Sequence, residues 1–236
     1  MNNLERLIIE KCPDGIEYKS IGEIAEITDY VANGSFKSIA DNVSYKKTED
    51  YAILIRLADF SSGFDKEKFV YIDEHAYNFL AKTKLYGGEI IMSNVGSVGT
   101  LFKCPKLNKP MSLAPNTIVI KTPNNDFYYH YLQTKEVQEK IKKITSKSAM
   151  PKFNKTEFRK IKVPVPPIEV QNEIVRILDN FTELTAELTA ELTAELTARQ
   201  KQYEYYRNKL LSFDESAAGL DTLHTHTHTD TSTDKK

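Results

Sequence analysis

The amino-acid sequence predicts a mixed α+β fold in which a single α/β domain is followed by one long coiled-coil-forming helix. Short β-branched runs, helical spacings and turn signals alternate through residues 1–165, as they do in α/β domains. Residues 168–213 contain neither Gly nor Pro and repeat apolar side chains at helical spacing. Residues 183–198 read ELTA four times over, and Ala, Leu and Glu are strong helix formers.

Changes in composition divide the chain into three parts. We expect a folded domain at residues 1–165, a helical spacer and dimerisation segment at 166–213, and a disordered tail at 214–236. The sequence VPVPPI at residues 163–168 marks the first boundary, because Pro is favoured in the first turn of a helix. The tail alternates His and Thr without an apolar pattern, which is typical of low-complexity segments.

Within the domain, alternation and turn residues place the individual elements. We expect strands at residues 51–57, 69–72, 89–92 and 117–121, and helical segments at 2–11, 76–85 and 127–144. Polar or Gly-rich loops are expected at residues 29–47, 93–100 and 145–153. Asn33-Gly34 predicts a tight turn inside the first of these loops.

Charge is divided unevenly along a chain whose formal net charge is −1. Residues 1–165 hold 25 Lys and Arg against 20 Asp and Glu, whereas residues 166–236 hold 7 against 13. The stretch 101–165 is the most basic, with 14 bases and 4 acids. A basic face of this kind favours a polyanion as partner, although a solvated Lys-rich surface would look the same in sequence.

The remaining composition indicates a soluble intracellular protein. No apolar run approaches the roughly 20 residues that cross a membrane, and the first ten residues do not read as a secretory signal. Cys12 and Cys104 lack the spacing of metal ligands. We therefore expect a cytoplasmic protein with reduced thiols, without a metal site and without a membrane partner.

The repeat makes a slowly rotating apolar ridge along the predicted helix. Four residues rise about 6 Å and turn about 400°, so each copy advances the ridge by roughly 40°. A single helix cannot bury such a stripe, so we expect it to pair with another helix. The interface positions that this predicts are Ile174, Ile177, Phe181, Leu184, Leu188, Leu192, Leu196, Tyr203, Tyr206 and Leu210.

No catalytic constellation is recognisable in the sequence. His75 and His130 have no acidic or Cys partner at metal-ligand spacing, and the glycines of SNVGSVG do not form a dinucleotide-binding fingerprint. We therefore predict a binding protein without catalytic residues and without a cofactor of its own. A nuclease or methyltransferase acting alone is the enzyme alternative, and a purely structural coiled-coil protein is the other.

Loops rich in Asn, Ser, Lys and Tyr are the best candidates for a binding surface. Asn and Lys can read purine edges in the major groove of DNA, while Lys and Ser can hold phosphates. The DNA-binding residues that we predict are Tyr30, Asn33, Ser35, Lys37, Lys46, Lys47, Asn94, Ser97, Lys147, Lys152 and Asn154.

Four segments together resemble the DNA-specificity subunit of type I restriction–modification systems. They are PDGIEYKSIGEIAEI at residues 13–27, YGGEIIMSNVGSVGT at 86–100, SAMPKFNKTEFRKIKVPVPPIEVQNEIVRILD at 148–179, and the TAEL-type repeat. The third segment includes a P-x-P-P-x-x-x-Q element, and the repeat resembles the spacer of one subgroup of the family.

This resemblance implies a target recognition domain and a set of partners. The usual subunit has two such domains, each reading half of a split DNA site, and two helical regions that pack antiparallel. It recruits methyltransferase subunits, which bind S-adenosylmethionine and methylate adenine, and restriction subunits join the same assembly. This chain has one domain and one helical region and resembles half of such a subunit.

We therefore expect a homodimer with identical domains at opposite ends, which reads an interrupted palindrome in double-stranded DNA. A stand-alone dimeric DNA-binding regulator, without a methyltransferase partner, remains the main alternative.

Overall fold

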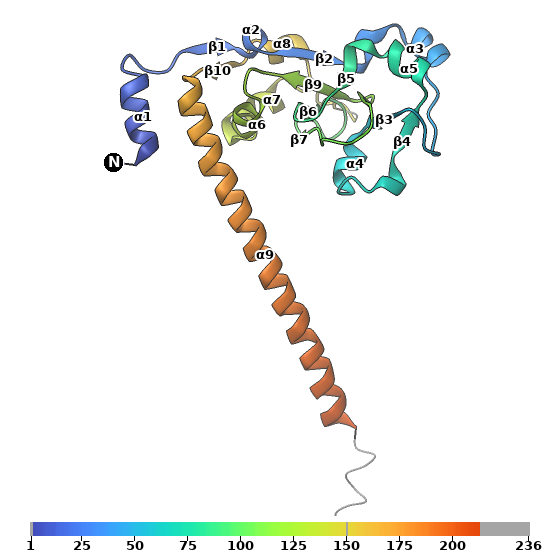
Figure 1. Ribbon diagram of the computed structural model, residues 1–236, viewed down its shortest axis with the longest axis vertical. Helices are drawn as coiled ribbons and strands as arrows, with labels where there is room; N and C mark the ends of the chain where they lie inside the picture. The colour runs from blue at the N-terminus through green and yellow to red at the C-terminus, as the bar shows by residue number, and fades with distance from the viewer. Residues whose placement is uncertain (1, 150, 213–236) are drawn as a thin grey trace, which may run out of the picture. The chain divides into compact units, whose positions relative to one another are not determined.

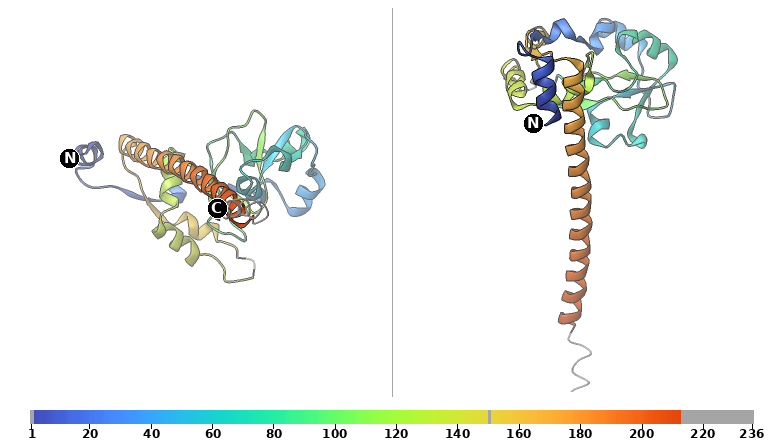
Figure 2. Two further views of the ribbon diagram at one scale, coloured as in Figure 1. Left: turned by 90° about the horizontal axis from the view of Figure 1, so that it is seen from below. Right: turned by 60° about the vertical axis from the view of Figure 1, so that its left-hand side comes forward.

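The computed structural model describes residues 2–149 and 151–212. They divide into a compact unit that ends at Leu178 and a second unit that begins at Asp179. The predicted mixed α+β class is confirmed, since sheets and short helices build the compact unit and α9 (Ile168–Leu211) is one long helix (Figures 1 and 2). That helix ends two residues earlier than expected, and the predicted tail at 214–236 lies outside the described residues.

A sheet buried on both faces forms the centre of the compact unit. Its strands are β2 (Glu26–Asp29), β9 (Thr117–Lys121), β6 (Ile90–Ser93) and β7 (Leu101–Lys103), all antiparallel and in that order. Successive side chains of a strand point to opposite faces. Ile90 and Met92 accordingly belong to one apolar cluster and Ile91 to another, so this sheet separates two cores.

A second sheet faces the first across one of these cores. It runs β4 (Val70–Ile72), β3 (Ala52–Ile55), β8 (Met111–Leu113) and β5 (Lys84–Leu85), with β3 and β8 parallel and the other neighbours antiparallel. Ile53 and Met111 pack with Ile91 and Phe102 of the first sheet. The two sheets are thus held together by side chains from their inner faces.

Helices cover the two outer faces. Tyr128 of α6 (Asn125–Leu132) and Ile141 of α7 (Lys135–Lys143) pack on the first sheet. Ile39 of α3 (Phe36–Asn42) and Ala76 of α5 (Glu74–Phe79) pack on the second. The compact unit therefore has four layers, with the two sheets inside.

A two-stranded ribbon joins the beginning of the domain to its end. β1 (Tyr18–Ser20) pairs antiparallel with β10 (Lys162–Pro164), and the Tyr128 hydroxyl donates to the Pro164 carbonyl at 3.1 Å. Helix α9 starts four residues after β10, and the Gln171 side chain donates to the Pro166 carbonyl at 2.7 Å. Near this start, Lys11 of α1 (Asn3–Lys11) lies 3.9 Å from Glu169.

The remaining short elements connect these layers. They are α2 (Ile21–Ile24), α4 (Leu57–Ser61), α8 (Lys155–Arg159) and the 3-10 turns η1 (Tyr30–Asn33), η2 (Lys66–Lys68) and η3 (Ala81–Thr83).

Several local expectations were wrong. The helix expected at 127–144 is two helices, α6 and α7, because Thr134 is extended and begins the second one. The helical segment expected at 76–85 ends in strand β5, since Leu85 pairs with Met111. The loop expected at 29–47 contains α3, whose first turn is capped by the Ser35 hydroxyl accepting from the Ser38 amide at 3.1 Å.

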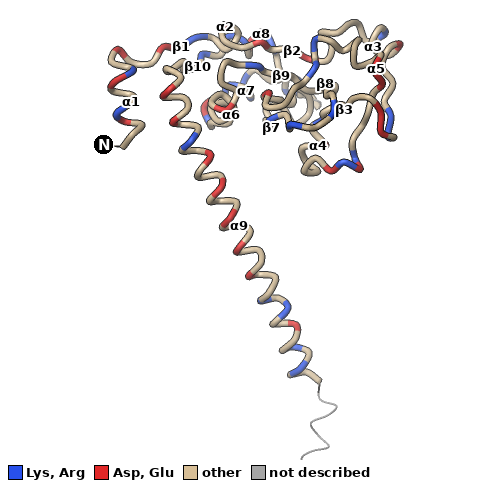
Figure 3. The backbone as a smooth tube through the Cα atoms, viewed as in Figure 1, with Lys and Arg blue, Asp and Glu red and all other residues tan. Residues whose placement is uncertain are grey.

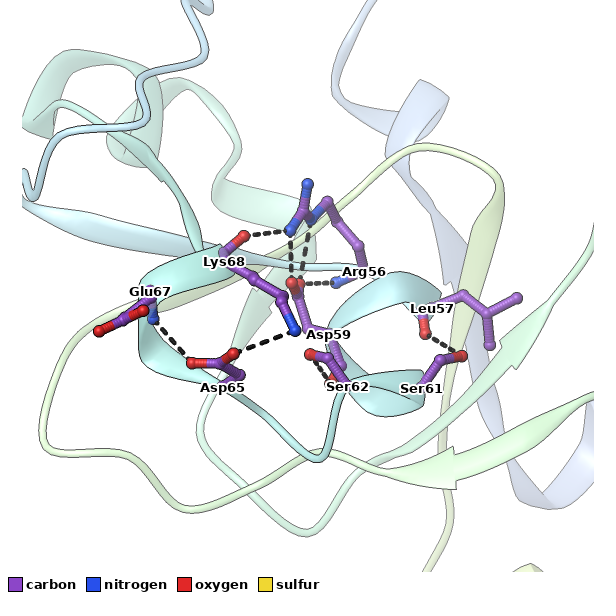
Figure 4. Close-up of polar contacts among 8 residues, drawn as sticks. All are labelled: Arg56, Leu57, Asp59, Ser61, Ser62, Asp65, Glu67 and Lys68. Atoms are coloured by element: carbon purple, nitrogen blue, oxygen red, sulfur yellow. Dashed lines mark hydrogen bonds and ion pairs between the residues drawn. The ribbon is translucent and has the colours of Figure 1, made fainter.

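Arg56, expected inside a strand, instead follows β3 and is the N-cap residue of α4 (Figure 4). The carboxylate of Asp59 is fully buried and accepts from the Arg56 backbone amide at 2.8 Å and from its Nε at 3.1 Å. Arg56 also donates through Nη2 to the Lys68 carbonyl at 2.6 Å. This pair ties α4 to the segment before β4 and keeps a buried charge compensated.

Replacing Arg56 by Ala should lower the free energy of unfolding by about 3 kcal/mol, because it leaves the buried Asp59 carboxylate without its partner. Lys68→Ala is the matched control, since it removes only the exposed ion pair with Asp65 at 3.1 Å and should cost about 0.5 kcal/mol or less. Urea unfolding of both variants measures the difference. Equal losses would contradict the structural role of the Arg56–Asp59 pair.

Candidate nucleic-acid interface

Strand register brings three polar residues to one end of the central sheet. Asp29, the last residue of β2, lies opposite Ile118, while Ser93, the last residue of β6, lies opposite Thr117. Asn94 follows directly after Ser93, and Asn116 comes directly before Thr117. Because β9 is antiparallel to both neighbours, Asp29, Asn94 and Asn116 all lie at the same end of the sheet.

Two loops that are far apart in sequence are joined at this edge. Val95 and Lys152 form an antiparallel bridge, and the Gly96 amide donates to the Pro151 carbonyl at 3.0 Å. A second bridge between Thr145 and Phe153 closes the segment that contains Lys152. The Gly-rich loop and the basic loop predicted from sequence are therefore parts of one surface.

The surface encloses a groove of about 870 Å³. Its apolar wall comes from η1, from α3 and from the segments on either side of them, and its polar rim comes from the two joined loops and from α8. We call it the recognition groove. The wall includes Tyr30, Phe36, Ile39, Tyr45 and Phe153, and the polar residues include Asp29, Asn94, Asn116, Lys152, Asn154 and Lys155.

The wall presents aromatic groups in two states of exposure. Phe36 is 83% exposed, whereas Tyr30 is buried and its hydroxyl lies 3.1 Å from that of Tyr45. Burial raises the pKa of the Tyr30 phenol, and the hydrogen bond with Tyr45 raises it further. Tyr30 therefore stays neutral and supports the wall, while Phe36 is free to contact a ligand.

Lys152 is the charged residue of the groove lining that remains after pairing is counted. The Lys155 ammonium donates to the Asp29 carboxylate at 2.5 Å, so these two groups compensate each other. Lys152 is exposed on the rim, and its backbone amide donates to the Ser146 hydroxyl at 3.0 Å. A cation beside a concave surface suits a phosphate backbone.

The structure brings together four of the eleven predicted DNA-binding residues. Tyr30, Asn94, Lys152 and Asn154 all line the recognition groove. Lys37, Lys47, Ser97 and Lys147 are exposed on neighbouring loops or on α3 and do not line it. Whether any of these residues touches DNA stays a prediction.

Several predicted residues are engaged within the protein. The Asn33 side chain donates to the Thr83 hydroxyl at 2.8 Å and accepts from the Lys82 amide at 3.0 Å. Lys46 donates to Asp50 at 2.6 Å, a hydrogen bond that raises the pKa of its ammonium. Ser35 and Asn154 cap α3 and α8. These contacts give each of the four side chains a structural role.

Four residues that line the recognition groove were not among the residues predicted from the sequence: Asp29, Phe36, Asn116 and Lys155. Asn116 has a positive φ of 67°, and the preceding Pro115 was the available turn signal. Phe36 follows a Ser that begins a helix, a pattern visible in the sequence but read as part of a polar loop. Nothing local marks Asp29 or Lys155, because their pairing spans 126 residues of sequence.

The predicted interface positions on α9 fall into two groups. Ile174 packs against the core of the compact unit and Ile177 is half-buried. The others are exposed along the helix: Phe181, Leu184, Leu188, Leu192, Leu196, Tyr203, Tyr206 and Leu210. The repeat satisfies its own hydroxyls, since Thr189 donates to the Thr185 carbonyl at 2.7 Å and Thr193 donates to the Thr189 carbonyl at the same distance.

The described residues contain no cluster of three or more His, Cys, Asp or Glu that could hold a metal. Burial raises the pKa of the Cys104 thiol, which disfavours a reactive thiolate. No helix in the described ranges has both the length and the apolar character needed to span a bilayer.

The fold and the groove define an α+β recognition domain that continues into a long helix. Residues 13–198 match the type I restriction modification DNA specificity domain. The chain belongs to this family, and the resemblance noted from its motifs is confirmed.

Individual relatives agree with this assignment. The chain is 35% identical over 217 residues to the Haemophilus influenzae type I restriction enzyme specificity subunit S.HindORF215P, covering 89% of this chain and 50% of that protein. The chain thus spans about half the length of the curated relatives it matches.

Two solved structures share the fold. One comes from work on the structural basis of complex assembly and conformational transition of the type I R-M system. It has a TM-score of 0.58 and 18% identity to this chain, and the match covers 81% of this chain and 44% of that chain. The other is the HsdS subunit from Thermoanaerobacter tengcongensis, with a TM-score of 0.50, 17% identity and coverage of 78% and 44%.

Proposed function

We propose that this chain is a non-catalytic, sequence-specific DNA-binding subunit of a type I restriction–modification complex. One recognition domain at residues 1–165 reads half of a DNA site, and the helix of residues 166–213 pairs with a second copy of the chain. The dimer reads an interrupted palindrome and positions methyltransferase subunits, with restriction subunits in the same assembly. The observation that carries this proposal is the family match over residues 13–198.

The partner enzymes would supply the chemistry. S-adenosylmethionine is expected in the methyltransferase subunit, and this chain contributes binding and spacing. The family assignment, the polar rim of the recognition groove and the basic stretch at 101–165 support double-stranded DNA as its ligand.

Exposed apolar side chains support pairing through the helix. Beyond the compact unit, Leu and aromatic residues recur on α9 and remain exposed in the single chain. A contiguous apolar stripe of this kind marks an interaction surface. A two-fold axis would let the same stripe from two copies bury itself.

Charge along α9 favours an antiparallel arrangement (Figure 3). Residues 168–195 carry seven acidic residues and one basic residue, whereas residues 196–211 carry four basic residues and one acidic residue. An antiparallel pair places the acidic part of one helix beside the basic end of the other. A parallel pair would place like charges together, which is unfavourable.

A stand-alone dimeric DNA-binding regulator is the second candidate, because groove and helix alone would suffice for it. Co-purification from cells separates the two proposals. Retention of a larger methyltransferase chain supports the restriction–modification role, and a chain that binds its site without any such partner supports the regulator.

Leu188→Asp combined with Leu192→Asp should convert the dimer to monomers at micromolar concentration, because it places four charges in the apolar seam of a dimer. Ala190→Asp with Ala194→Asp is the matched control, since these positions lie on roughly the opposite face of the helix and should leave the dimer intact. Sedimentation velocity measures both. A wild-type chain that sediments only as monomer would refute self-pairing.

Deleting one ELTA unit should shorten the gap between half-sites by on the order of one or two base pairs. Each unit spans about 6 Å of helix, and a base pair rises about 3.4 Å. The measurement is the methylated motif in DNA from cells that express each chain with its partner. The wild type should give an interrupted palindrome, and the deletion should keep the half-site sequence; an unchanged gap would contradict the spacer role.

Lys152→Ala should weaken DNA binding by a similar factor for every sequence and reduce the slope of log affinity against log salt by about 1, as expected on losing one phosphate contact. Lys160→Ala is the control, because Lys160 is exposed, pairs with Glu157 at 2.7 Å and lies outside the recognition groove. Fluorescence anisotropy at several salt concentrations tests this. A loss confined to one sequence would argue against a phosphate contact.

A further inference from the structure

Two buried side-chain oxygens in the recognition groove have no hydrogen-bond partner within the described protein. They are Oδ1 of Asn94 and Oδ1 of Asp29, and both residues line the groove. The third such atom in the described ranges is Oε1 of Gln171, on the first turn of α9. A buried acceptor without a donor is unfavourable, so two of them in one groove point to a ligand that donates hydrogen bonds.

The backbone amide and carbonyl of Asn94 are both hydrogen-bonded, whereas its side-chain oxygen has no partner within the described protein. Its amide donates to the Asn116 carbonyl at 3.0 Å, and its carbonyl accepts from the Phe153 amide at 3.3 Å. These bonds fix the residue between the β8–β9 turn and the basic loop. A backbone fixed in this way limits the positions that the side chain can reach, which favours discrimination between ligands.

Asp29 supplies a second acceptor whose charge is already compensated. It is 6% exposed, and Lys155 occupies its Oδ2 at 2.5 Å. An uncompensated carboxylate would repel a phosphate backbone, but the pair with Lys155 removes that obstacle. Oδ1 can therefore accept a hydrogen bond from an amino group of a base without placing net negative charge against DNA.

The donors that fit these acceptors are exocyclic amino groups of bases. In the major groove, adenine presents its N6 amino group and cytosine its N4 amino group. An Asn amide can accept from adenine N6 while donating to adenine N7, and a carboxylate can accept from an amino group. Lys152 on the rim would hold the phosphate backbone.

We propose that Asn94 is a specificity-determining residue that reads an adenine, and that Asp29 reads the amino group of a neighbouring base. This inference rests on the proposed DNA-binding function and assigns it to particular residues and a class of base edge. A peptide of a partner protein could also donate N–H groups to these acceptors, but the family match over residues 13–198 and the lysine on the rim favour DNA.

The first test selects bound DNA from a random pool with the full-length wild type, Asn94→Ala and Asn108→Ala. Asn108 is exposed and lies outside the recognition groove, so Asn108→Ala is a matched control for Asn94→Ala. Asn94→Ala should lose its preference at one base pair of each half-site, with affinity for the wild-type site lowered roughly 5- to 150-fold. Asn108→Ala should keep the wild-type preference at every position.

A second test changes the DNA instead of the protein. Purine in place of adenine at that position removes only the N6 amino group. It should weaken binding by the wild type and leave Asn94→Ala unaffected, because the variant has no acceptor to lose. Asp29→Asn keeps the side-chain volume and should alter preference only at an adjacent position.

Thermal unfolding distinguishes a loss of base recognition from a loss of protein stability. Asn94→Ala should unfold at the wild-type temperature or above it, because it removes an unpaired buried acceptor. A lower unfolding temperature with uniformly weaker binding would assign Asn94 a structural role and overturn the inference, as would an unchanged base preference or a loss of methyltransferase retention alone. A wild-type chain without any sequence preference would instead refute the proposed function itself.

Discussion

The antiparallel pairing of β9 with both β2 and β6 is the constraint on which the recognition domain depends. β6 is buried throughout and β9 is buried up to Lys121, so the alternate side chains of these two strands must fill two cores at once. A slip of one residue would exchange the two sets of side chains and disrupt both cores. The same register fixes which residues emerge at the sheet edge, so packing inside the domain determines the chemistry of the recognition groove.

Long-range pairing also explains how much the sequence could predict. The runs EIIM and TIVIK predicted strands because β-branched residues without breakers have few alternatives, and residues 168–211 predicted a helix by spacing alone. Asn94 and Lys152, which line the recognition groove, were predicted as DNA-binding residues from loop composition. Their convergence depends on the Val95–Lys152 bridge, which joins residues 57 positions apart and has no local signature.

The errors have specific physical causes. The helix at 127–144 was read as continuous because its apolar residues keep helical spacing across Thr134, whose extended backbone divides it. Asp29 and Lys155 were missed because a buried ion pair is defined by two distant elements and not by either sequence alone. Ile174 shares the apolar pattern of the exposed stripe, yet it packs on the domain core, so spacing could not separate the two environments of α9.

The Thr hydroxyls of the ELTA repeat find their hydrogen-bond partners within the same helix, and this affects how the length of the repeat can change during evolution. Each Thr hydroxyl in the repeat donates to the carbonyl four residues before it, so these hydroxyls need no partner outside the helix. Gain or loss of a whole unit leaves the hydrogen bonds of the remaining units intact. The repeat is therefore a place where inherited changes in length preserve a folded product, and selection can act on the dimensions of the protein separately from the residues of its groove.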